Sequence, residues 1–398
     1  MKRIVHITCV HNAFDGRIMY RECAWLAKSG YEVFLIAPAR FQEKIKENVR
    51  IIGLKKPGSR FKRPFAWLEI LKKVLELKPD ILHFHDPELL VILPFVRLFA
   101  GKKTKLVYDV HEYLVDSIRD KFWIPEKMRP IAARLVQQAE YFLGSFVDGQ
   151  IFVVNGQTKF YSKWRTKKMI LHNYPDLEKF DCLRQKNYQP EKRISDIFDI
   201  GNTDNTKDNS LILIYIGSLY ERRGIMTMLK ALKILVSKGF KPLLVLGGIF
   251  EDKSFKNKVK KYIREHNIDK NVRITGWIDY KRIKDYLECA DAVWLPHPAT
   301  EQYTKDSVST KQLEAMLASL PVICSDLLPL TRFIDEAECG LAVDPTDPLE
   351  HAKAVIWLCE NPEEAKQMGN RGRMLVMEKY SWQKEFKNLE KFYAQLLK

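Results

Sequence analysis

One short stretch of the chain combines a helix start, a lysine and a carboxylate, groups suited to binding a phosphate and vicinal hydroxyls. Ser309 followed by Gln312 has the spacing of a capping box, which predicts a helix from Thr310 with unpaired backbone N–H groups in its first turn. Such an end attracts anions, and Lys311 adds a full positive charge. Glu314, one turn further, could accept hydrogen bonds from the hydroxyls of a ribose. The alternative is an ordinary capped helix on which Glu314 forms a surface ion pair.

A second candidate anion site follows the apolar run at 211–216. Gly217 and Ser218 end that run, and Arg222 and Arg223 stand directly before a helical stretch. Gly217 lets a ligand approach the backbone closely, and arginine binds a diphosphate through several fixed donors. The alternative is a pair of solvated arginines at a helix start. The sequence has no Gly-x-x-x-x-Gly-Lys-Ser/Thr loop and no Gly-x-Gly-x-x-Gly, so neither a P-loop nor a dinucleotide fingerprint is supported.

The elements that position these residues follow from hydrophobic periodicity. Short apolar runs alternate with longer segments of helical spacing, which predicts βαβ units on parallel sheets. Expected strands lie at Ile4–Val10, Glu32–Ala37, Ile81–His85, Lys105–Val110, Leu211–Ile216, Pro242–Leu246, Val272–Thr275, Ala292–Leu295, Pro321–Cys324 and Leu341–Val343. Expected helices lie at Ile18–Lys28, Phe65–Leu77, Met226–Ser237, Lys256–Glu265 and Thr310–Ala318. The predicted fold class is α/β, with two Rossmann-like doubly wound domains.

A polar stretch at 186–210, rich in Asn and Asp, separates the two series of strands. We therefore expect an N-terminal domain at 1–185, a linker or insertion at 186–210 and a C-terminal domain at 211–380. Apolar residues at helical spacing predict a last helix in 381–398 that packs back on the N-terminal domain. Ligands of doubly wound sheets bind at the carboxyl ends of the strands, which predicts a cleft that the two domains face.

The composition is that of a soluble globular protein, with 398 residues, 46% of them hydrophobic and 29% charged. The seven cysteines form no Cys-x-x-Cys pair, which argues against a disulfide framework and a zinc site and favours a reducing compartment. His6 interrupts the first apolar run, and no apolar run approaches the length of a membrane span. We expect neither a signal peptide nor a transmembrane helix.

The positive charge is concentrated in the first half of the chain. The net charge is +16, of which the first 200 residues carry +13, and this asymmetry predicts an anionic partner. Basic and aromatic residues mix at Lys55–Arg63 and Arg119–Arg129, which suits an anionic membrane surface. Solvated loops with buried aromatics are the alternative. No nucleic-acid-binding module accompanies these residues, so nucleic acid is not an expected partner. We expect a cytoplasmic protein, with the inner membrane face as its candidate peripheral site.

Several motifs follow one another along nearly the whole chain. They are Tyr108–Glu112, Gly217, Arg223–Gly224, Gly276–Trp277, Asp306, Glu314–Met316 and Pro321–Ile323. This order resembles the family 4 retaining glycosyltransferases of the GT-B fold, of the bacterial polysaccharide and glycan type. The family signature is Glu, seven residues, Glu, and Asp306 stands at its first position with Glu314 at its second. Ser218 follows Gly217 where the family has Gly-Arg, which leaves Arg222 or Arg223 to supply the cation of the phosphate clamp.

The resemblance implies a hexosyltransferase that moves a sugar from a nucleotide-diphosphate donor to a glycan or lipid-linked acceptor, with retention and without a metal ion. Asp306 would contact the sugar and Glu314 the ribose, and both would count as catalytic residues together with His111, which matches a histidine near the transferred sugar. A lone histidine is more often structural. The donor would be bound by the residues Gly217, Ser218, Arg222, Arg223, Ser309, Thr310 and Lys311, with the loop at Gly276 and Trp277 on the base.

In the same family the loop at 11–17 faces the acceptor, which implies acceptor roles for His11, Asp15 and Arg17. The alternative is a turn in which Asp15 caps the helix that starts near Arg17. His83, His85 and Asp86 are of metal-ligating types, but we expect them to shape a strand end, and we expect neither a metal site nor a cofactor other than the donor substrate. Two other functions stay open: a nucleotide-sugar epimerase of the same fold, and a non-catalytic nucleotide- or carbohydrate-binding protein.

Overall fold

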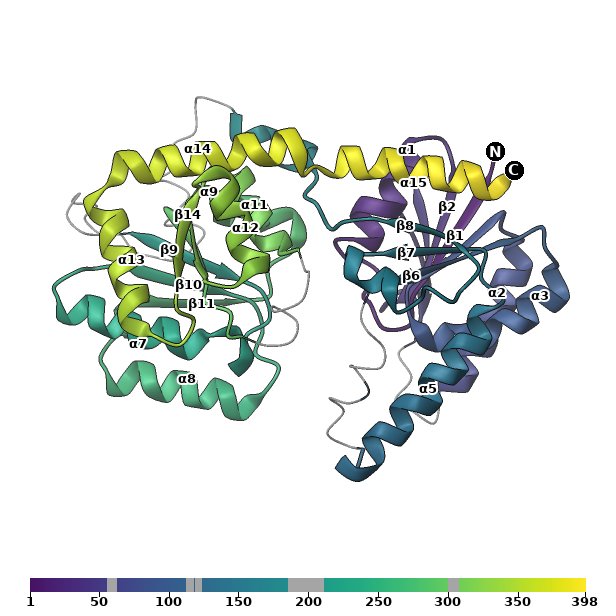
Figure 1. Cartoon of the computed structure of the whole chain (residues 1–398), viewed down its shortest axis with the longest axis horizontal. Helices are drawn as coiled ribbons and strands as arrows, with labels where there is room; N and C mark the ends of the chain where they lie inside the picture. The colour runs from purple at the N-terminus through teal and green to yellow at the C-terminus, as the bar shows by residue number, and fades with distance from the viewer. Residues whose placement is uncertain (56–62, 112–117, 119–123, 185–210, 300–307) are drawn as a thin grey trace. The chain divides into compact units, whose positions relative to one another are not determined.

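The chain forms two compact units (Figure 1). The computed structural model describes residues 1–55, 63–111, 118, 124–184, 211–299 and 308–398. The first unit comprises Met1–Asn173 and Gln383–Lys398, and the second comprises Tyr174–Trp382. The first unit thus ends before residue 185, because Tyr174 and Phe180 pack into the core of the second unit. The last sixteen residues rejoin the first unit.

The first unit is built on an eight-stranded sheet of order β3-β4-β2-β1-β5-β6-β7-β8. Neighbouring strands are parallel, except that β3 and β4 form an antiparallel hairpin. The strands are β1 (Arg3–Ile7), β2 (Glu32–Pro38), β3 (Glu43–Lys46), β4 (Val49–Leu54), β5 (Ile81–Phe84), β6 (Lys105–Val110), β7 (Gly149–Phe152) and β8 (Lys167–Ile170). The hairpin was not among the expected elements, since the four residues of β3 carry three charges.

Helices cover both faces of this sheet. One face packs against α2 (Arg63–Leu77), α3 (Leu93–Ala100) and α5 (Arg129–Gly144) through a core that includes Val5, Leu82 and Leu106. Toward the other face lie a π-helical turn at Ile18–Cys23, α1 (Ala24–Lys28) and α15 (Trp382–Leu397). Side chains alternate along a strand, so the neighbours of those core residues, among them His6 and His83, point to this second face.

The second unit contains a six-stranded parallel sheet of order β11-β10-β9-β12-β13-β14. The strands are β9 (Ile212–Ile216), β10 (Leu243–Gly247), β11 (Val272–Gly276), β12 (Ala292–Leu295), β13 (Val322–Ser325) and β14 (Gly340–Val343). The helices are α7 (Ile225–Ser237), α8 (Lys253–Glu265), α9 (Ile283–Glu288), α11 (Thr310–Leu317), α12 (Leu328–Ala337), α13 (Pro348–Glu360) and α14 (Pro362–Lys379). The predicted α/β fold with two doubly wound sheets is confirmed. Across the described ranges, no helix combines the length and apolar character needed to cross a bilayer.

Candidate functional site

In the second unit, loops that follow β9, β10 and β12 meet where these strands end. The Gly217 N–H donates to Gly247 O at 2.8 Å, and a Cβ on Gly248 would lie 1.9 Å from Gly217 O. Gly224 has φ +71°, and a Cβ there would lie 1.7 Å from Pro296 O. Only glycine fits such positions, and this close packing places the start of α7 and the adjacent Arg223 against the loop after β12.

Lys311, in the first turn of α11, reaches the glycine turn after β9. A Cβ on Gly217 would lie 2.5 Å from Lys311 Cε and 3.0 Å from its Nζ. Burial and the positive charge of Arg223 lower the pKa of Lys311 to about 8, although Glu314 acts in the opposite direction. A lysine whose charge is disfavoured by burial and by a neighbouring arginine favours an anionic ligand. The structure also separates the two arginines: Arg222 is exposed, whereas Arg223 is half-buried and near Lys311.

The helix α11 starts as predicted. Ser309 Oγ accepts a hydrogen bond from the Gln312 N–H at 3.4 Å. The second half of the expected capping box is not formed, because the Gln312 side chain donates to Leu330 O at 2.8 Å instead. Glu314 is buried rather than on the surface, and its Oε1 accepts a hydrogen bond from the Tyr280 hydroxyl at 3.3 Å. The carboxylate is therefore held in one orientation one turn from Lys311.

Two aromatic residues of this cluster were not among the predicted site residues. His297 is fully buried directly after β12, and burial together with the charges of Lys311 and Arg223 holds its pKa well below the ordinary value. The Tyr215 ring lies 5.9 Å from Lys311 Nζ, and its hydroxyl donates to Ser218 O at 3.3 Å. The signal in the sequence was their place at the ends of neighbouring strands, β9 and β12.

The remaining residues assigned to the donor lie as follows. Thr310 is the first residue of α11, and Ser218 lies in the turn after β9. Gly276, with φ +75°, ends β11 beside Gly247 of β10, and Trp277 after it is 73% exposed. Asp306 lies outside the described residues.

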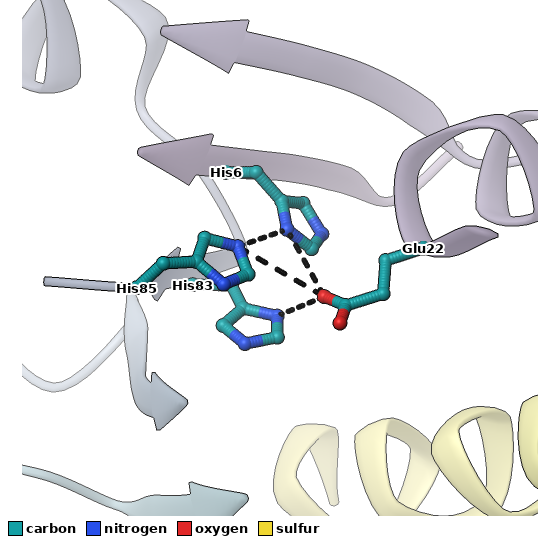
Figure 2. A group of neighbouring side chains, drawn as sticks. All are labelled: His6, Glu22, His83 and His85. Carbon is teal, nitrogen blue, oxygen red and sulfur yellow. Dashed lines mark hydrogen bonds and ion pairs between the residues drawn. The ribbon is translucent and has the colours of Figure 1, made fainter. Parts of the chain in front are cut away.

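In the first unit, polar residues gather on the sheet face that carries α1 and α15. Three neighbouring strand ends supply them, because His6 of β1 pairs in register with His83 of β5, and Asp109 of β6 is on the same face. His6 Nδ1 lies 3.0 Å from His85 Nε2, and His83 Nδ1 lies 2.6 Å from the Tyr393 hydroxyl of α15. Figure 2 shows the three imidazoles around the Glu22 carboxyl, all of them buried.

Arg17 anchors this cluster. Its guanidinium pairs with Asp109 at 3.1 Å and with Glu22 at 2.9 Å, and it donates to Leu171 O and to Asn173 Oδ1. Arg17 was predicted to bind an acidic group of an acceptor. That role is wrong for this structure, because the side chain is buried and its donors are used within the chain.

The two carboxyls beside Arg17 titrate in opposite directions. Burial would raise the pKa of Asp109, but the Arg17 guanidinium and hydrogen bonds from His111 and His85 hold it well below its usual range. Burial, together with the nearby charge of Asp109, raises the pKa of Glu22 well above its usual range, against the pull of Arg17. Beside the Arg17 cation, the cluster therefore favours the ionised form of Asp109 and the neutral form of Glu22.

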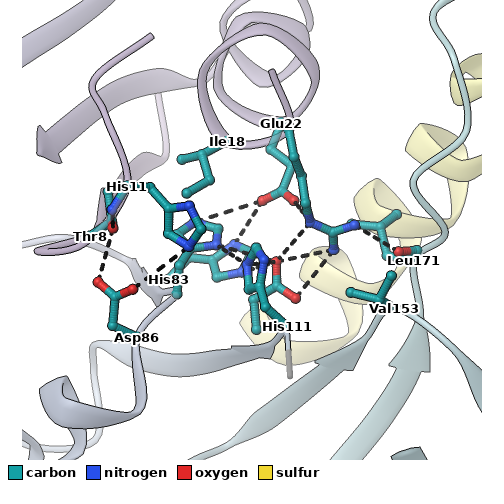
Figure 3. A network of polar contacts seen from close by, with 12 residues as sticks. Thr8, His11, Ile18, Glu22, His83, Asp86, His111, Val153 and Leu171 are labelled. Carbon is teal, nitrogen blue, oxygen red and sulfur yellow. Dashed lines mark hydrogen bonds and ion pairs between the residues drawn. The ribbon is translucent and has the colours of Figure 1, made fainter. Parts of the chain in front are cut away.

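The other predicted residues of the first unit lie at the edge of this cluster (Figure 3). Asp15 Oδ1 accepts hydrogen bonds from the backbone N–H groups of Arg17 and Ile18, the capping arrangement that was the alternative to an acceptor role. The His11 and His111 rings are 5.2 Å apart, and both side chains are partly exposed, 33% and 18%. His11 and His111 are thus the imidazoles of this cluster that reach the surface of the unit.

Among the described residues, two groups of side chains of metal-ligating types have their potential ligand atoms close together. One ligand atom from each of His6, Glu22, His83 and His85 lies within 4.8 Å of the others, and the same holds for His85, Asp109 and His111. A divalent cation in the first group would lie beside the Arg17 guanidinium, whose Nε is 2.9 Å from Glu22 Oε1, and this repulsion disfavours it. The expectation of no bound metal stays a prediction.

Two family profiles match the chain. The profile described as "Glycosyl transferases group 1" matches residues 198–375, and the one described as "Glycosyltransferase Family 4" matches residues 16–167. Together they cover well over half of the chain.

Individual relatives are distant. The chain is 24% identical over 217 residues to an alpha-D-kanosaminyltransferase of Streptomyces kanamyceticus, a match that covers 50% of this chain and 54% of the relative. The chain spans about half the length of the curated relatives it matches. The sucrose-phosphate synthase of Thermosynechococcus elongatus has a similar fold, with a TM-score of 0.74, 18% identity and coverage of 100% and 99% of the two chains. Anabaena Alr3699/HepE, crystallised in complex with UDP-glucose, has a TM-score of 0.72, 12% identity and coverage of 99% and 100%.

Proposed function

Because the chain belongs to the family 4 glycosyltransferases of the GT-B fold, we propose that it transfers a hexose from a nucleotide-diphosphate donor to a glycan or lipid-linked acceptor in polysaccharide assembly. The proposal of a nucleotide-diphosphate donor rests on two neighbouring cations, Arg223 and Lys311, at the glycine turn after β9. A structural neighbour that was crystallised with UDP-glucose supports the same class.

In the proposed donor complex, Lys311 and Arg223 hold the diphosphate, and the first-turn amides of α11 add donors. Glu314, held by Tyr280, accepts hydrogen bonds from the ribose hydroxyls. The loop at Gly276 and the exposed Trp277 offer an aromatic face to the base. Asp306 contacts the sugar, as the family signature implies. His11 and His111 of the first unit serve the acceptor and the transferred sugar.

Departure of the nucleoside diphosphate is the step these residues assist. As the glycosidic bond breaks, negative charge grows on the leaving phosphate, and fixed cations stabilise that charge without reorganising. We propose that this replaces a metal ion, and that the new bond forms with retention of the anomeric configuration. Undiminished transfer in the presence of EDTA would support the first point, and the anomeric proton coupling of the product would report the second.

The first experiment is thermal unfolding with a panel of nucleoside diphosphates and nucleotide sugars. A ligand at 100 times its Kd stabilises the native state by about 2.7 kcal/mol, so one base should raise the midpoint by several degrees. The nucleotide sugar that binds is then incubated with acceptors. No shift with any nucleotide would contradict the proposed donor site and favour a binding role for another ligand. Conversion of the donor to an epimer, without a transferred product, would contradict the proposed transfer.

The affinity for the nucleoside diphosphate should fall as the pH rises above about 8. Binding an anion raises the pKa of Lys311 from about 8, so binding takes up a proton only above that pH. We expect a constant Kd between about pH 7 and 7.5, where the phosphate is already ionised, and a Kd that rises up to about tenfold per pH unit above pH 8. Titration calorimetry measures it, and Lys311→Met should remove this slope. An equally steep slope in Lys311→Met would assign the titration to another group.

We also propose that the first unit rests on an anionic membrane surface, where a lipid-linked acceptor would be met. The basic segments that first suggested this lie largely outside the described residues. The support is a set of exposed apolar side chains on α2, α3 and α5, helices that pack on one face of the sheet. They are Phe65, Leu68, Phe95, Leu98, Phe99, Ile131, Leu135 and Phe142. Exposed Lys102, Lys103 and Arg134 accompany them and suit anionic headgroups.

Sedimentation with vesicles tests this surface. The protein should bind vesicles that contain phosphatidylglycerol at low salt and should bind less at high salt. The double substitution Leu98→Asp and Phe99→Asp should abolish binding. Met374→Asp, at an equally exposed position of the second unit, is the matched control and should change nothing. Binding that is unchanged in the double variant, or absent in the wild type, would refute the membrane assignment.

A further inference from the structure

The partly exposed His111 ring contacts two buried groups. Its Nε2 lies 3.2 Å from Asp109 Oδ2 and 3.1 Å from His85 Nδ1. His85 Nδ1 is itself 3.2 Å from the same Asp109 oxygen. The three groups therefore form a triangle in which His111 is the member with exposed surface. Figure 3 shows His111 within this network of polar contacts.

The charge of Asp109 decides where the protons of this triangle are. Asp109 pairs with Arg17 through both of its oxygens, at 3.1 and 3.2 Å, and an ionised carboxylate can only accept hydrogen bonds. A lone pair on either neighbouring imidazole nitrogen would face the carboxylate lone pairs at 3.2 Å. Both His85 Nδ1 and His111 Nε2 therefore carry hydrogen and donate to the same Asp109 oxygen, so the 3.1 Å between them is a contact of two N–H groups and not a hydrogen bond.

The proton positions of the next buried imidazole, His6, are fixed in the same way. Once His85 carries its proton on Nδ1, its Nε2 is an acceptor, and the partner at 3.0 Å, His6 Nδ1, is the donor. The backbone of His111 is fixed too, because Gln157 Nε2 donates to His111 O at 3.3 Å. Ring orientation and tautomer are thus set by groups that have no exposed surface of their own.

We propose that Asp109 and His85 are positioning residues that hold His111 as the Nε2–H tautomer, so that Nδ1 accepts a hydrogen bond from a hydroxyl of a bound sugar. The assignment of a sugar as the ligand rests on the proposed function, whereas the tautomer does not. The arrangement favours a ligand that offers a hydrogen-bond donor to Nδ1. A ligand that presents only acceptors, such as a carboxylate, would be repelled by the lone pair of Nδ1.

The tautomer is tested on the free protein. In a protein labelled with 15N-histidine, long-range proton–nitrogen spectra at pH 7.5 distinguish the protonated from the unprotonated ring nitrogen. The signals of His111 are identified by their loss in His111→Gln. We expect Nε2 to be protonated and Nδ1 unprotonated. An Nδ1–H tautomer, a rapidly exchanging mixture or a doubly protonated ring in the wild type would overturn the proposal.

The positioning role is tested with Asp109→Asn, which removes the fixed acceptor charge and nearly keeps the shape. We expect the single tautomer to be lost and kcat/KM for transfer to fall roughly tenfold or more, the scale of one hydrogen bond. The midpoint shift produced by the nucleoside diphosphate should be unchanged. His266→Gln, in the second unit, is the control. If Asp109→Asn does not fold, His85→Gln takes its place, and the wild-type spectrum still decides. If the tautomer is as expected but no sugar transfer is found, the proposed function fails and the tautomer assignment stands.

Discussion

Substitution of Arg17 by Met is expected to lower the free energy of unfolding of the first unit by about 3 to 5 kcal/mol, the cost of leaving a buried charge without its partner. Arg17 is buried and pairs with Asp109 and Glu22, and its substitution leaves the Asp109 carboxylate in the core. Urea denaturation, with the transitions of the two units fitted separately, measures the loss. Lys72→Met removes an exposed cation 4.0 Å from Glu76 and should cost less than about 1 kcal/mol.

The two members of the pair should not be equivalent. When Asp109 is replaced by Asn, burial still raises the pKa of Glu22, but the added effect of the Asp109 charge disappears, so the ionised form of Glu22 beside Arg17 becomes more favourable. When Arg17 is replaced, Asp109 keeps its contacts with His85 and His111 but loses the permanent positive charge beside it. We therefore expect Arg17→Met to be the more destabilising substitution. Equal losses would mean that Glu22 is already ionised in the native protein.

The loss of unfolding free energy in Arg17→Met should also depend on pH. In the wild type the pKa of Asp109 is depressed, so its contribution is present above the unfolded pKa of about 3.9 and is lost as the pH falls through the lower folded value. Without Arg17, the pKa of Asp109 loses the strongest influence that lowers it, and burial, which raises it, is opposed by His111 and His85. The difference between variant and wild type should then be largest at neutral pH and shrink as the medium becomes acidic.

Substitution of Lys311 by Met is expected to reduce kcat for sugar transfer by about 10²- to 10³-fold, the usual effect of removing one group that stabilises charge on a leaving or attacking atom. Arg223→Met should act in the same direction. Arg222→Met is the matched control, because Arg222 is a neighbouring but exposed arginine. Initial rates with saturating donor and acceptor measure the effect. Similar losses for Arg222→Met and Arg223→Met would contradict the separation that the structure makes between them.

The same Lys311 variant should be at least as stable as the wild type. The lowered pKa of Lys311 means that its charged form is disfavoured in the folded protein by burial and by Arg223. Removing that charge relieves the repulsion, so the thermal midpoint should hold or rise while activity falls. A fall in both would indicate that Lys311 supports the fold rather than the reaction.

Much of the fold could be predicted because each parallel strand is a short apolar run between helical segments. Lys105–Val110 and Ala292–Leu295 were predicted with the bounds that the structure gives. The β3–β4 hairpin could not be predicted in this way, since β3 is charged and exposed at the sheet edge. The first domain was expected to end at residue 185, whereas the first unit ends at Asn173. The expected boundary rested on the polarity of the following segment, which does not report that Tyr174 and Phe180 pack in the second unit.

The two candidate sites differ in how much of each could be predicted from the sequence. Around Lys311, the cap, the glycine turn and the arginines lie in continuous motifs, so their types and spacing predicted a common ligand. In the first unit, Arg17 meets Asp109 across 92 residues, and His6 meets His85 across 79. Such contacts depend on strand order and register, which periodicity does not give, and so Arg17 was assigned to the surface.

The return of α15 to the first unit has a consequence for synthesis. Tyr393 of α15 bonds to His83, and Phe392 and Leu396 pack at Gly149, so the first unit closes only with residues that leave the ribosome after the whole second unit. The second unit, continuous from Tyr174 to Trp382, can fold while translation proceeds. Until α15 emerges, the sheet face that carries His6, His83 and Asp109 lacks the helix that packs on it. We expect nascent chains stalled before residue 382 to expose that face to chaperones.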